Sequence, residues 1–264
     1  MLLAQIIKKL EELAPPSLGL SKDVYGLQFG TKIGMDKKNI NKVLIALDPS
    51  KFAIAEAVKN KANLMITHHG LTHSPIMEIN DDLLDKIRLL SENRINLFVI
   101  HTAWDAAPSG VAETFASKCS LKIVEPLNFH DGPHKKAIGR ICVPHDPITV
   151  ERLAQRIKNN LDLKSVKVHG KIDAQINKVA ICPGKGITKE SIFTAAEKEC
   201  DCYITGEATY KEVLDIKTFG ITLIETSHYS SELPGMESLY RTLSLEFPRT
   251  EFVLYREEEN TYFV

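Results

Sequence analysis

Apolar residues recur at helical spacing at the start of the chain, at Leu2, Leu3, Ile6, Ile7, Leu10 and Leu13. The pattern stops at Pro15-Pro16, because proline cannot continue a helix, and it therefore predicts an amphipathic opening helix. Beyond it, short β-branched runs at 43–47, 64–67 and 97–100 alternate with helical patterns near 54–58 and from about 82 to 92. This alternation predicts a parallel sheet covered by helices.

The second half of the chain repeats the first in kind. A polar stretch from Pro126 to Lys136 interrupts the pattern, and we predict a domain boundary there, with an N-terminal α/β domain at 1–125 and a C-terminal α/β domain at 126–264. Further strands are predicted at 137–143, 178–182, 202–205, 221–226 and 251–257, with helices at 149–160, 189–199 and 236–245.

The two halves also share details of sequence. Setting the segment from Lys42 above the segment from Lys178 aligns Thr67 with Thr205, and the next strands end at Ile100-His101-Thr102 and Ile224-Glu225-Thr226. We interpret this similarity as an internal duplication, although two generic βαβ units could also resemble each other by chance. The predicted fold class is α/β, with two related three-layer domains.

Composition restricts the function. The 264 residues carry 33 Lys+Arg and 34 Asp+Glu, a net charge of −1, which argues against a strong non-specific nucleic-acid or membrane binder. No apolar run is long enough to span a bilayer and no signal peptide is recognisable, so we expect a cytoplasmic protein. The five cysteines form no CxxC pair, and we expect them to be reduced and buried.

Histidines follow several predicted strands at the point where each strand ends. His68 and His69 follow the second strand, His101 follows the third, and His228 lies just beyond the strand at 221–226. Ligands of open α/β sheets bind beyond the carboxyl ends of the strands. Two of these histidines precede a carboxylate by four residues, as His101 with Asp105 and His228 with Glu232, a spacing that allows each pair to share an ion.

Together these side chains form a candidate metal site of four imidazoles and two carboxylates, a donor set suited to Zn²⁺, Mn²⁺, Fe²⁺ or Ni²⁺. Six donors exceed the need of one tetrahedral ion, and adjacent histidines point in different directions. We therefore predict two neighbouring ions per chain, about 3.5 to 4 Å apart. Any single histidine at a strand end could instead be an ordinary hydrogen-bonded residue.

Ordered motifs along the whole chain are similar to those of the NIF-three-like family (Ngg-interacting factor three), whose members are also called GTP cyclohydrolase 1 type 2 homologs. The motifs are the stretches at 23–30, 46–48, 66–69, 101–107, 205–207 and 228–232. One departure is Gly70, where the family usually has proline. The chain also lacks the long insert that some bacterial members carry between their halves.

The resemblance implies two related α/β domains with a dinuclear metal site in the cleft between them. It also implies a toroidal homohexamer, a trimer of dimers. Carried over position by position, His68, His69, Asp105, His228 and Glu232 are the implied ligands, with Glu232 the bridge, and His101 matches a further site residue. Trp104, beside Asp105, could stack a planar substrate or only form part of the pocket wall.

The predicted activity is metal-dependent hydrolysis of a nucleotide-like or phosphate-containing substrate, because a pair of divalent ions supplies hydroxide at neutral pH. We name His101, Glu207 and Glu225 as candidate proton carriers. The two glutamates could instead be helix caps or hydrogen-bond partners of a ligating imidazole. The loop Pro183-Gly184-Lys185-Gly186 could bind an anion or be a plain turn.

Two other functions compete with hydrolysis. A ring-shaped assembly could bind nucleic acid if local basic residues lined its opening, and the candidates are His134-Lys135-Lys136 with Arg140, or Lys164, Lys167 and Lys171. The protein could also store or carry metal without turnover. Salt dependence would identify the first alternative, and sensitivity to a chelator would identify hydrolysis.

Overall fold

The structure is a computed structural model that describes residues 1–72, 74 and 76–257. Contacts divide the chain into two compact units. Unit 1 comprises Met1–Pro16, Lys22–His101 and Leu239–Val264, and unit 2 comprises Ser17–Ser21 and Thr102–Ser238. Two helices run across this division, α4 (His101–Ala106) and α9 (His228–Glu246).

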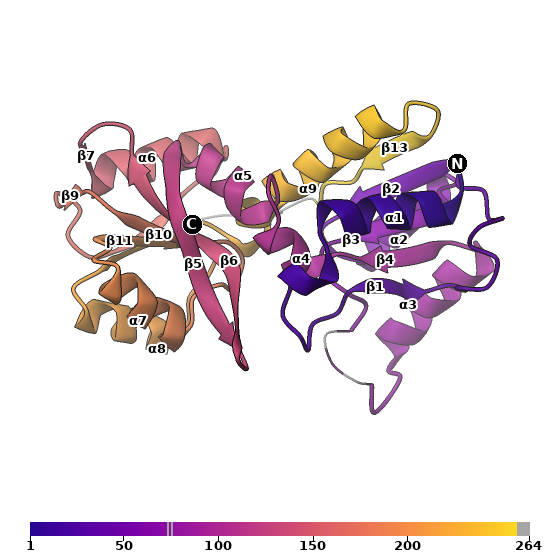
Figure 1. Cartoon of the computed structure of the whole chain (residues 1–264), viewed down its shortest axis with the longest axis horizontal. Coiled ribbons are helices and arrows are strands. Elements are labelled where there is room, and N and C mark those ends of the chain that lie inside the picture. The colour runs from indigo at the N-terminus through magenta and orange to yellow at the C-terminus, as the bar shows by residue number, and fades with distance from the viewer. Residues whose placement is uncertain (73, 75, 258–264) are drawn as a thin grey trace. The chain divides into compact units, whose positions relative to one another are not determined.

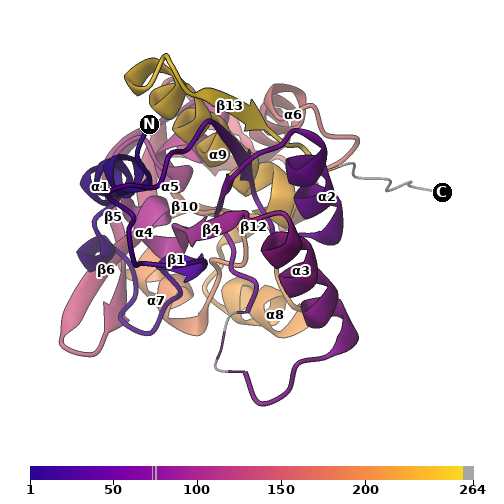
Figure 2. The same ribbon diagram turned by 90° about the vertical axis from the view of Figure 1, so that its right-hand side faces the viewer.

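Unit 1 is built on a five-stranded sheet in the order β1-β4-β3-β2-β13. Its strands are β1 (Gly26–Phe29), β2 (Lys42–Ala46), β3 (Leu64–Thr67), β4 (Asn96–Val99) and β13 (Glu251–Leu254). The helices α2 (Lys51–Lys59) and α3 (Asp81–Glu92) cover one face of this sheet, and α1 (Leu3–Leu13) covers the other (Figure 2). Burial of apolar side chains between these layers, such as Leu44, Ala53 and Met65, forms the core of unit 1.

Unit 2 is built on a six-stranded sheet in the order β5-β6-β10-β11-β12-β8. Its strands are β5 (Leu121–Asp131), β6 (His134–Pro144), β8 (Lys167–His169), β10 (Val179–Cys182), β11 (Cys202–Thr205) and β12 (Thr222–Glu225). The helices α5 (Val111–Lys118) and α6 (Val150–Asn160) lie on one face, and α7 (Lys189–Glu197) and α8 (Tyr210–Thr218) lie on the other (Figure 1). The short strands β7 (Ile148–Thr149) and β9 (Gln175–Ile176) pair with each other in a separate two-stranded sheet. The 3-10 helix η1 (Pro16–Leu18) lies where the chain first passes from unit 1 to unit 2.

Alternation of side chains along the strands explains why unit 2 has three layers. Val179 and Ile181 of β10 pack into the cluster under α5 and α6, whereas Ala180 and Cys182 pack into the cluster under α7 and α8. Successive residues of a strand point to opposite faces, so a strand that is apolar throughout is buried on both sides. The mixed α/β fold predicted from the sequence is confirmed.

The two units share a plan of three parallel strands, β2-β3-β4 in unit 1 and β10-β11-β12 in unit 2. In each unit an antiparallel strand, β1 or β8, pairs with the third of them. The register differs in one respect from the predicted alignment. Thr67 pairs with Val99 and Thr205 pairs with Glu225, so Glu225 corresponds to Val99, two positions before His101.

Two features differ from the predicted division of the chain. The polar stretch near residues 126–136 forms the end of a long antiparallel hairpin, β5–β6, with Gly132 in its turn at a φ of 61°. The predicted boundary between residues 125 and 126 therefore falls within β5, inside unit 2. The C-terminal strand β13 pairs in parallel with β2 and extends the sheet of unit 1 at that edge, where Phe252 is buried.

All five cysteines are buried and form no disulfide, as predicted. Within residues 1–72, 74 and 76–257, no helix combines the length and apolar character needed to cross a membrane.

Candidate metal centre

Three histidines gather at the carboxyl ends of β3 and β4 in unit 1. His68 and His69 follow β3, and both of their backbone amides donate to the carbonyl of Leu47, at 3.1 and 3.0 Å. His101 follows β4 and begins α4, and its amide donates to the carbonyl of His68 at 3.1 Å. Parallel strands end at the same edge of a sheet, so residues that are distant in sequence meet there.

The three imidazole rings lie against one another edge to face. Ring centroids are 4.9 Å apart for His68 and His69, 5.1 Å for His68 and His101, and 5.4 Å for His69 and His101. One ring nitrogen of each lies within 4.8 Å of one nitrogen of each of the others. His68 is fully buried and His69 is nearly so. This histidine cluster could hold a divalent metal ion.

Two aspartates contact the histidine cluster. Nδ1 of His69 is 2.8 Å from Oδ1 of Asp48, which follows β2, and Nδ1 of His101 is 2.5 Å from Oδ1 of Asp23, which precedes β1. Metal-binding histidines commonly donate their other ring N–H to a carboxylate, which orients the ring and increases its basicity. The pattern in unit 1 therefore fits the chemistry of a metal site.

In unit 2, the first turn of α9 brings His228 and Glu232 together. Their spacing of four residues places Nε2 of His228 3.1 Å from Oε2 of Glu232, and Nδ1 of His228 is 3.2 Å from Oε1 of Glu207. The hydrogen bond with Glu232, helped by the charge of Glu207, raises the pKa of His228 to about 9. Two carboxylates beside one imidazole are a further set of metal donors.

Asp105 is a second buried carboxylate of unit 2. Its exposed fraction is 7%, and that of Glu232 is 5%. Burial raises the pKa of the Cys182 thiol, and the charges of Asp105 and Glu232 raise it further. Buried negative charges of this kind are unfavourable unless a cation compensates them.

The loop after β10 packs directly against these donors. Gly184 has a φ of 58°, and a Cβ added there would lie 1.9 Å from Oε1 of Glu232. Its amide donates to Oγ of Ser231 at 2.8 Å, and its carbonyl accepts from the amide of Glu207 at 3.0 Å. This loop is a glycine turn whose lack of a side chain leaves room for the Glu232 carboxylate.

A family model described as Duf34/NIF3 (NGG1p interacting factor 3) matches residues 1–261. The chain belongs to this family. It is 31% identical over 274 residues to a GTP cyclohydrolase 1 type 2 homolog of Clostridium perfringens, covering 99% of both chains. The solved structure of a Bacillus cereus protein related to NIF3 has the same fold, with a TM-score of 0.88, 20% identity and coverage of 100% and 99%. Reduced HcgD from Methanocaldococcus jannaschii is 28% identical, with a TM-score of 0.82 and coverage of 96% and 97%.

The NIF3-family resemblance read from the sequence is thus confirmed. Of the candidate ligands, the structure groups His68, His69 and His101 in unit 1, and brings Asp105, His228 and Glu232 to one region of unit 2. Their roles as ligands stay predictions. Neither Asp23 nor Asp48 was a predicted site residue, although both lie in stretches that resemble the family. Asp48 follows a strand at the same sheet edge as His68 and His69, a signal that could have identified it.

The candidate proton carriers lie in different surroundings. Glu207 contacts the imidazole of His228, which agrees with the alternative prediction that it is a hydrogen-bond partner of an imidazole. Glu225 is buried and accepts hydrogen bonds from Nε2 of His169 at 2.6 Å and from the amide of Ala208 at 2.9 Å. Glu225 therefore fixes the segment that carries Glu207.

Two other residues have structural partners. Trp104 is 1% exposed and its indole N–H donates to the carbonyl of Gly235 at 3.0 Å, so it packs inside unit 2 instead of presenting a face for stacking. Arg140 is 5% exposed and binds Glu113 at 3.1 Å and the carbonyl of Ala106 at 2.9 Å. Its charge is therefore neutralised internally and does not contribute to a basic surface.

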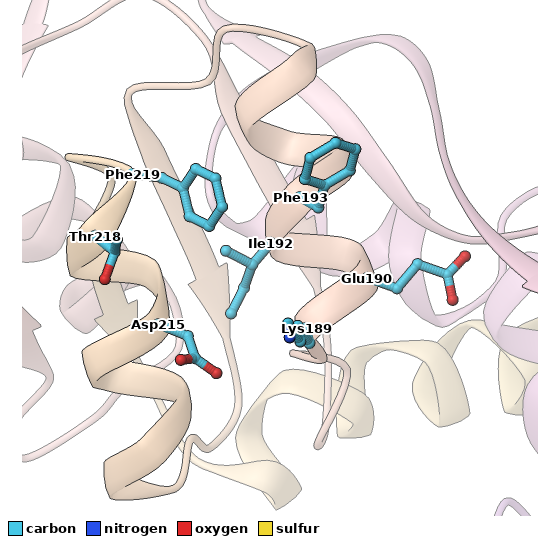
Figure 3. A pocket seen from close by; sticks show the side chains of 7 residues that line it. All are labelled: Lys189, Glu190, Ile192, Phe193, Asp215, Thr218 and Phe219. Atoms are coloured by element: carbon cyan, nitrogen blue, oxygen red, sulfur yellow. The ribbon is translucent and has the colours of Figure 1, made fainter.

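A separate pocket of about 580 Å³ lies between α7 and α8 of unit 2 (Figure 3). Phe193, Phe219 and Ile192 form its apolar part, and Lys189 and Asp215 lie at its opposite end. None of the residues that line it is a candidate ligand, so the chemistry of the histidine cluster is independent of this pocket.

Proposed function

We propose that this protein binds two divalent metal ions per chain and uses them to hydrolyse a nucleotide-like or phosphate-containing substrate. The proposed ligands are the histidine cluster of unit 1 and the donors of unit 2, namely His68, His69, His101, Asp105, His228 and Glu232. The observation that carries this proposal is the pair of aspartates at Nδ1 of His69 and His101, since such pairs are typical of metal-binding imidazoles.

Chain connectivity favours a joint site. His101 and Asp105 are separated by one turn of α4, so the same short helix carries one donor of each unit. The donor set, imidazole nitrogens with carboxylate oxygens, suits Zn²⁺, Mn²⁺, Fe²⁺ or Ni²⁺. Six donors would be enough to hold two ions, and Glu232 would be the residue that they share.

A bound pair of divalent ions would lower the pKa of a bound water to about 7 and polarise the group under attack. The residues of the chain then orient the ligands and move protons. Glu207 is half-exposed and adjoins His228, so it can exchange protons with solvent. Glu225 is engaged by His169 and Ala208, and we assign it a positioning role.

The substrate class rests on the relatives. Curated relatives from several bacteria and an archaeon carry the name GTP cyclohydrolase 1 type 2 homolog, which supports a nucleotide as the first substrate to test. We also propose the homohexameric, ring-shaped assembly and the cytoplasmic location that the family resemblance implies. Sedimentation at micromolar concentration tests the assembly, and a monomer alone would contradict it.

Metal analysis of the purified protein tests the proposal directly. We expect close to two ions per chain, and we expect the double variant His68→Ala/His69→Ala to lose at least one of them while remaining folded. His130→Ala is the matched control, because His130 also pairs with a carboxylate but lies in an exposed pair with Glu190. Full metal content in the double variant would refute the assignment.

Turnover is tested with a panel of nucleotides and phosphoesters, with and without a chelator. Hydrolysis that disappears with the chelator and returns with added metal is the expected result. Two ions without turnover of any compound would contradict the hydrolase and favour metal storage. A nucleic-acid complex that weakens steeply with salt would favour the binding alternative.

A further inference from the structure

The two aspartates beside the histidine cluster restrict which nitrogen of each imidazole can bind metal. An ionised carboxylate only accepts hydrogen bonds, so a ring nitrogen at 2.5 or 2.8 Å from it must carry the proton. We infer that Asp23 and Asp48 hold His101 and His69 in the Nδ1–H tautomer and present Nε2 of both rings to a metal ion. This inference rests on the proposed metal site and assigns both aspartates as positioning residues.

Metal binding through Nε2 would leave His101 in only one of the two roles considered for it. A proton carrier must gain and lose a proton in each turnover, and it therefore needs a ring nitrogen that can exchange with substrate or solvent. With Nδ1–H donated to Asp23 and Nε2 directed to a metal ion, both nitrogens of His101 are committed. Once Nε2 of His101 binds a metal ion, His101 can no longer carry protons, so this proposal gives that role to Glu207.

Asp23 is held rigidly for this task. Its side chain is 13% exposed, and its Oδ1 also accepts the amide of Val24 at 2.8 Å. The backbone of His101 is fixed as well, at a φ of 20° that is uncommon for a residue with a side chain, by the hydrogen bond from its amide to His68. Asp23 lies 78 residues from His101 in sequence, so the pairing is a product of the fold.

Asp48 contacts His69 in a wetter environment. The Asp48 side chain is 50% exposed, whereas the His69 side chain is 10% exposed. Water screens the interaction of exposed charges and can replace a lost acceptor, so removing Asp48 should perturb its histidine less than removing Asp23. The structure therefore predicts an order of effect between the two aspartates.

A purely structural role for the aspartates gives a different expectation. In that case their removal would lower the free energy of unfolding but leave the histidine tautomers and the metal affinity of the folded protein unchanged. The informative substitution is Asp→Asn, because the amide can accept from Nδ1–H through its oxygen or donate to Nδ1 through its nitrogen. Asparagine keeps the shape of the side chain and no longer selects one tautomer.

The test compares Asp23→Asn, Asp48→Asn and the control Glu190→Gln with the unchanged protein. Glu190 is the matched control, because its Oε1 lies 2.5 Å from Nδ1 of His130 in an exposed pair. Long-range ¹H–¹⁵N NMR of the metal-free chain reads the tautomer of each imidazole, and competition with a chromophoric chelator gives the zinc affinity.

We expect Nδ1–H signals for His69 and His101 in the unchanged protein. We expect zinc affinity to fall about 10- to 100-fold in Asp23→Asn, less in Asp48→Asn and not at all in Glu190→Gln. An Nε2–H tautomer for His101, or unchanged zinc affinity in Asp23→Asn, would overturn the inference. The tautomers of the unchanged, metal-free protein can be measured whether or not any variant folds. A failure of the proposed metal site would appear differently, as an unchanged protein that binds no zinc.

Discussion

Gly184→Ala separates the geometry of the metal centre from the stability of the fold. The new Cβ would lie 1.9 Å from Oε1 of Glu232, a distance that non-bonded atoms do not tolerate. Because the clashing atom is the far end of a flexible side chain, the carboxylate can retreat by about 1.5 Å while the backbone stays in place. Metal–ligand distances are fixed within about 0.2 Å, so the displaced Glu232 should no longer serve as a ligand.

The energetic cost of the substitution is expected to be modest. Alanine at the φ of 58° observed for Gly184 is destabilised by about 1–2 kcal/mol, because this left-handed conformation is unfavourable for a residue with a Cβ. Gly220→Ala is the matched control, because Gly220 has a φ of 71° in the same unit and its added Cβ would meet nothing within 4 Å. In the presence of a chelator, Gly220→Ala should therefore lose about 1–2 kcal/mol of unfolding free energy, and Gly184→Ala at least as much, because the displaced Glu232 also gives up its contact with His228.

The assay is urea unfolding with a chelator and with zinc, together with metal analysis of the purified variants. Zinc should stabilise the unchanged protein and Gly220→Ala to the same extent, and Gly184→Ala less, because a ligand that binds only the folded state stabilises it by an amount that grows with the logarithm of its affinity. Gly184→Ala should also contain less metal. Equal metal content and equal stabilisation by zinc in the two glycine variants would refute the placement of Glu232 in the metal centre.

Three further predictions concern other contacts. Arg140→Met should lower the unfolding free energy by about 2–3 kcal/mol, because Glu113 and the carbonyl of Ala106 lose a charged donor, and a loss below 1 kcal/mol in urea unfolding would contradict this role. Trp104→Phe should cost about 1–3 kcal/mol and leave the metal content unchanged, because it removes the hydrogen bond to the buried carbonyl of Gly235 and leaves a small cavity at a buried position, and altered metal content would contradict this. His228 has a folded-state pKa of about 9, above its usual 6.5, so its contribution to the stability of the metal-free protein is present below about pH 6.5 and is lost as pH rises through 9. Zinc competes with that proton, so apparent zinc affinity should rise with pH up to about 9 in the unchanged protein, and an equally steep rise in His228→Asn would contradict this assignment.

The elements of the fold were predictable because hydrophobic periodicity is local. The strand at 64–67 and the helix from about 82 to 92 match β3 and α3 closely, since each buries an apolar face that is visible in a short window of sequence. The pairing of β13 with β2 was not predictable in this way. It joins segments about 200 residues apart, and nothing in the apolar pattern of either strand specifies its partner.

The candidate site was predictable for a related reason. In a parallel sheet, strand order brings the carboxyl ends together, so His68, His69 and His101 could be grouped from their positions at strand ends. Asp23 was not grouped with them, because it precedes the edge strand β1 and reaches His101 only through the antiparallel pairing of β1 with β4. The role of Gly184 also depends on the close approach of its loop to Glu232 of α9, which the periodicity of the chain does not indicate.

The central claim is that the histidine cluster and the donors of unit 2 bind two metal ions together. A crystal structure of the zinc-loaded protein, with diffraction data collected on both sides of the zinc absorption edge, tests it most directly. We predict two anomalous peaks per chain, about 3.5 to 4 Å apart, with Nε2 of His69 and His101 and the carboxylate of Glu232 as ligands. Anomalous density that is absent from the neighbourhood of His68, His69 and His101 would contradict the account.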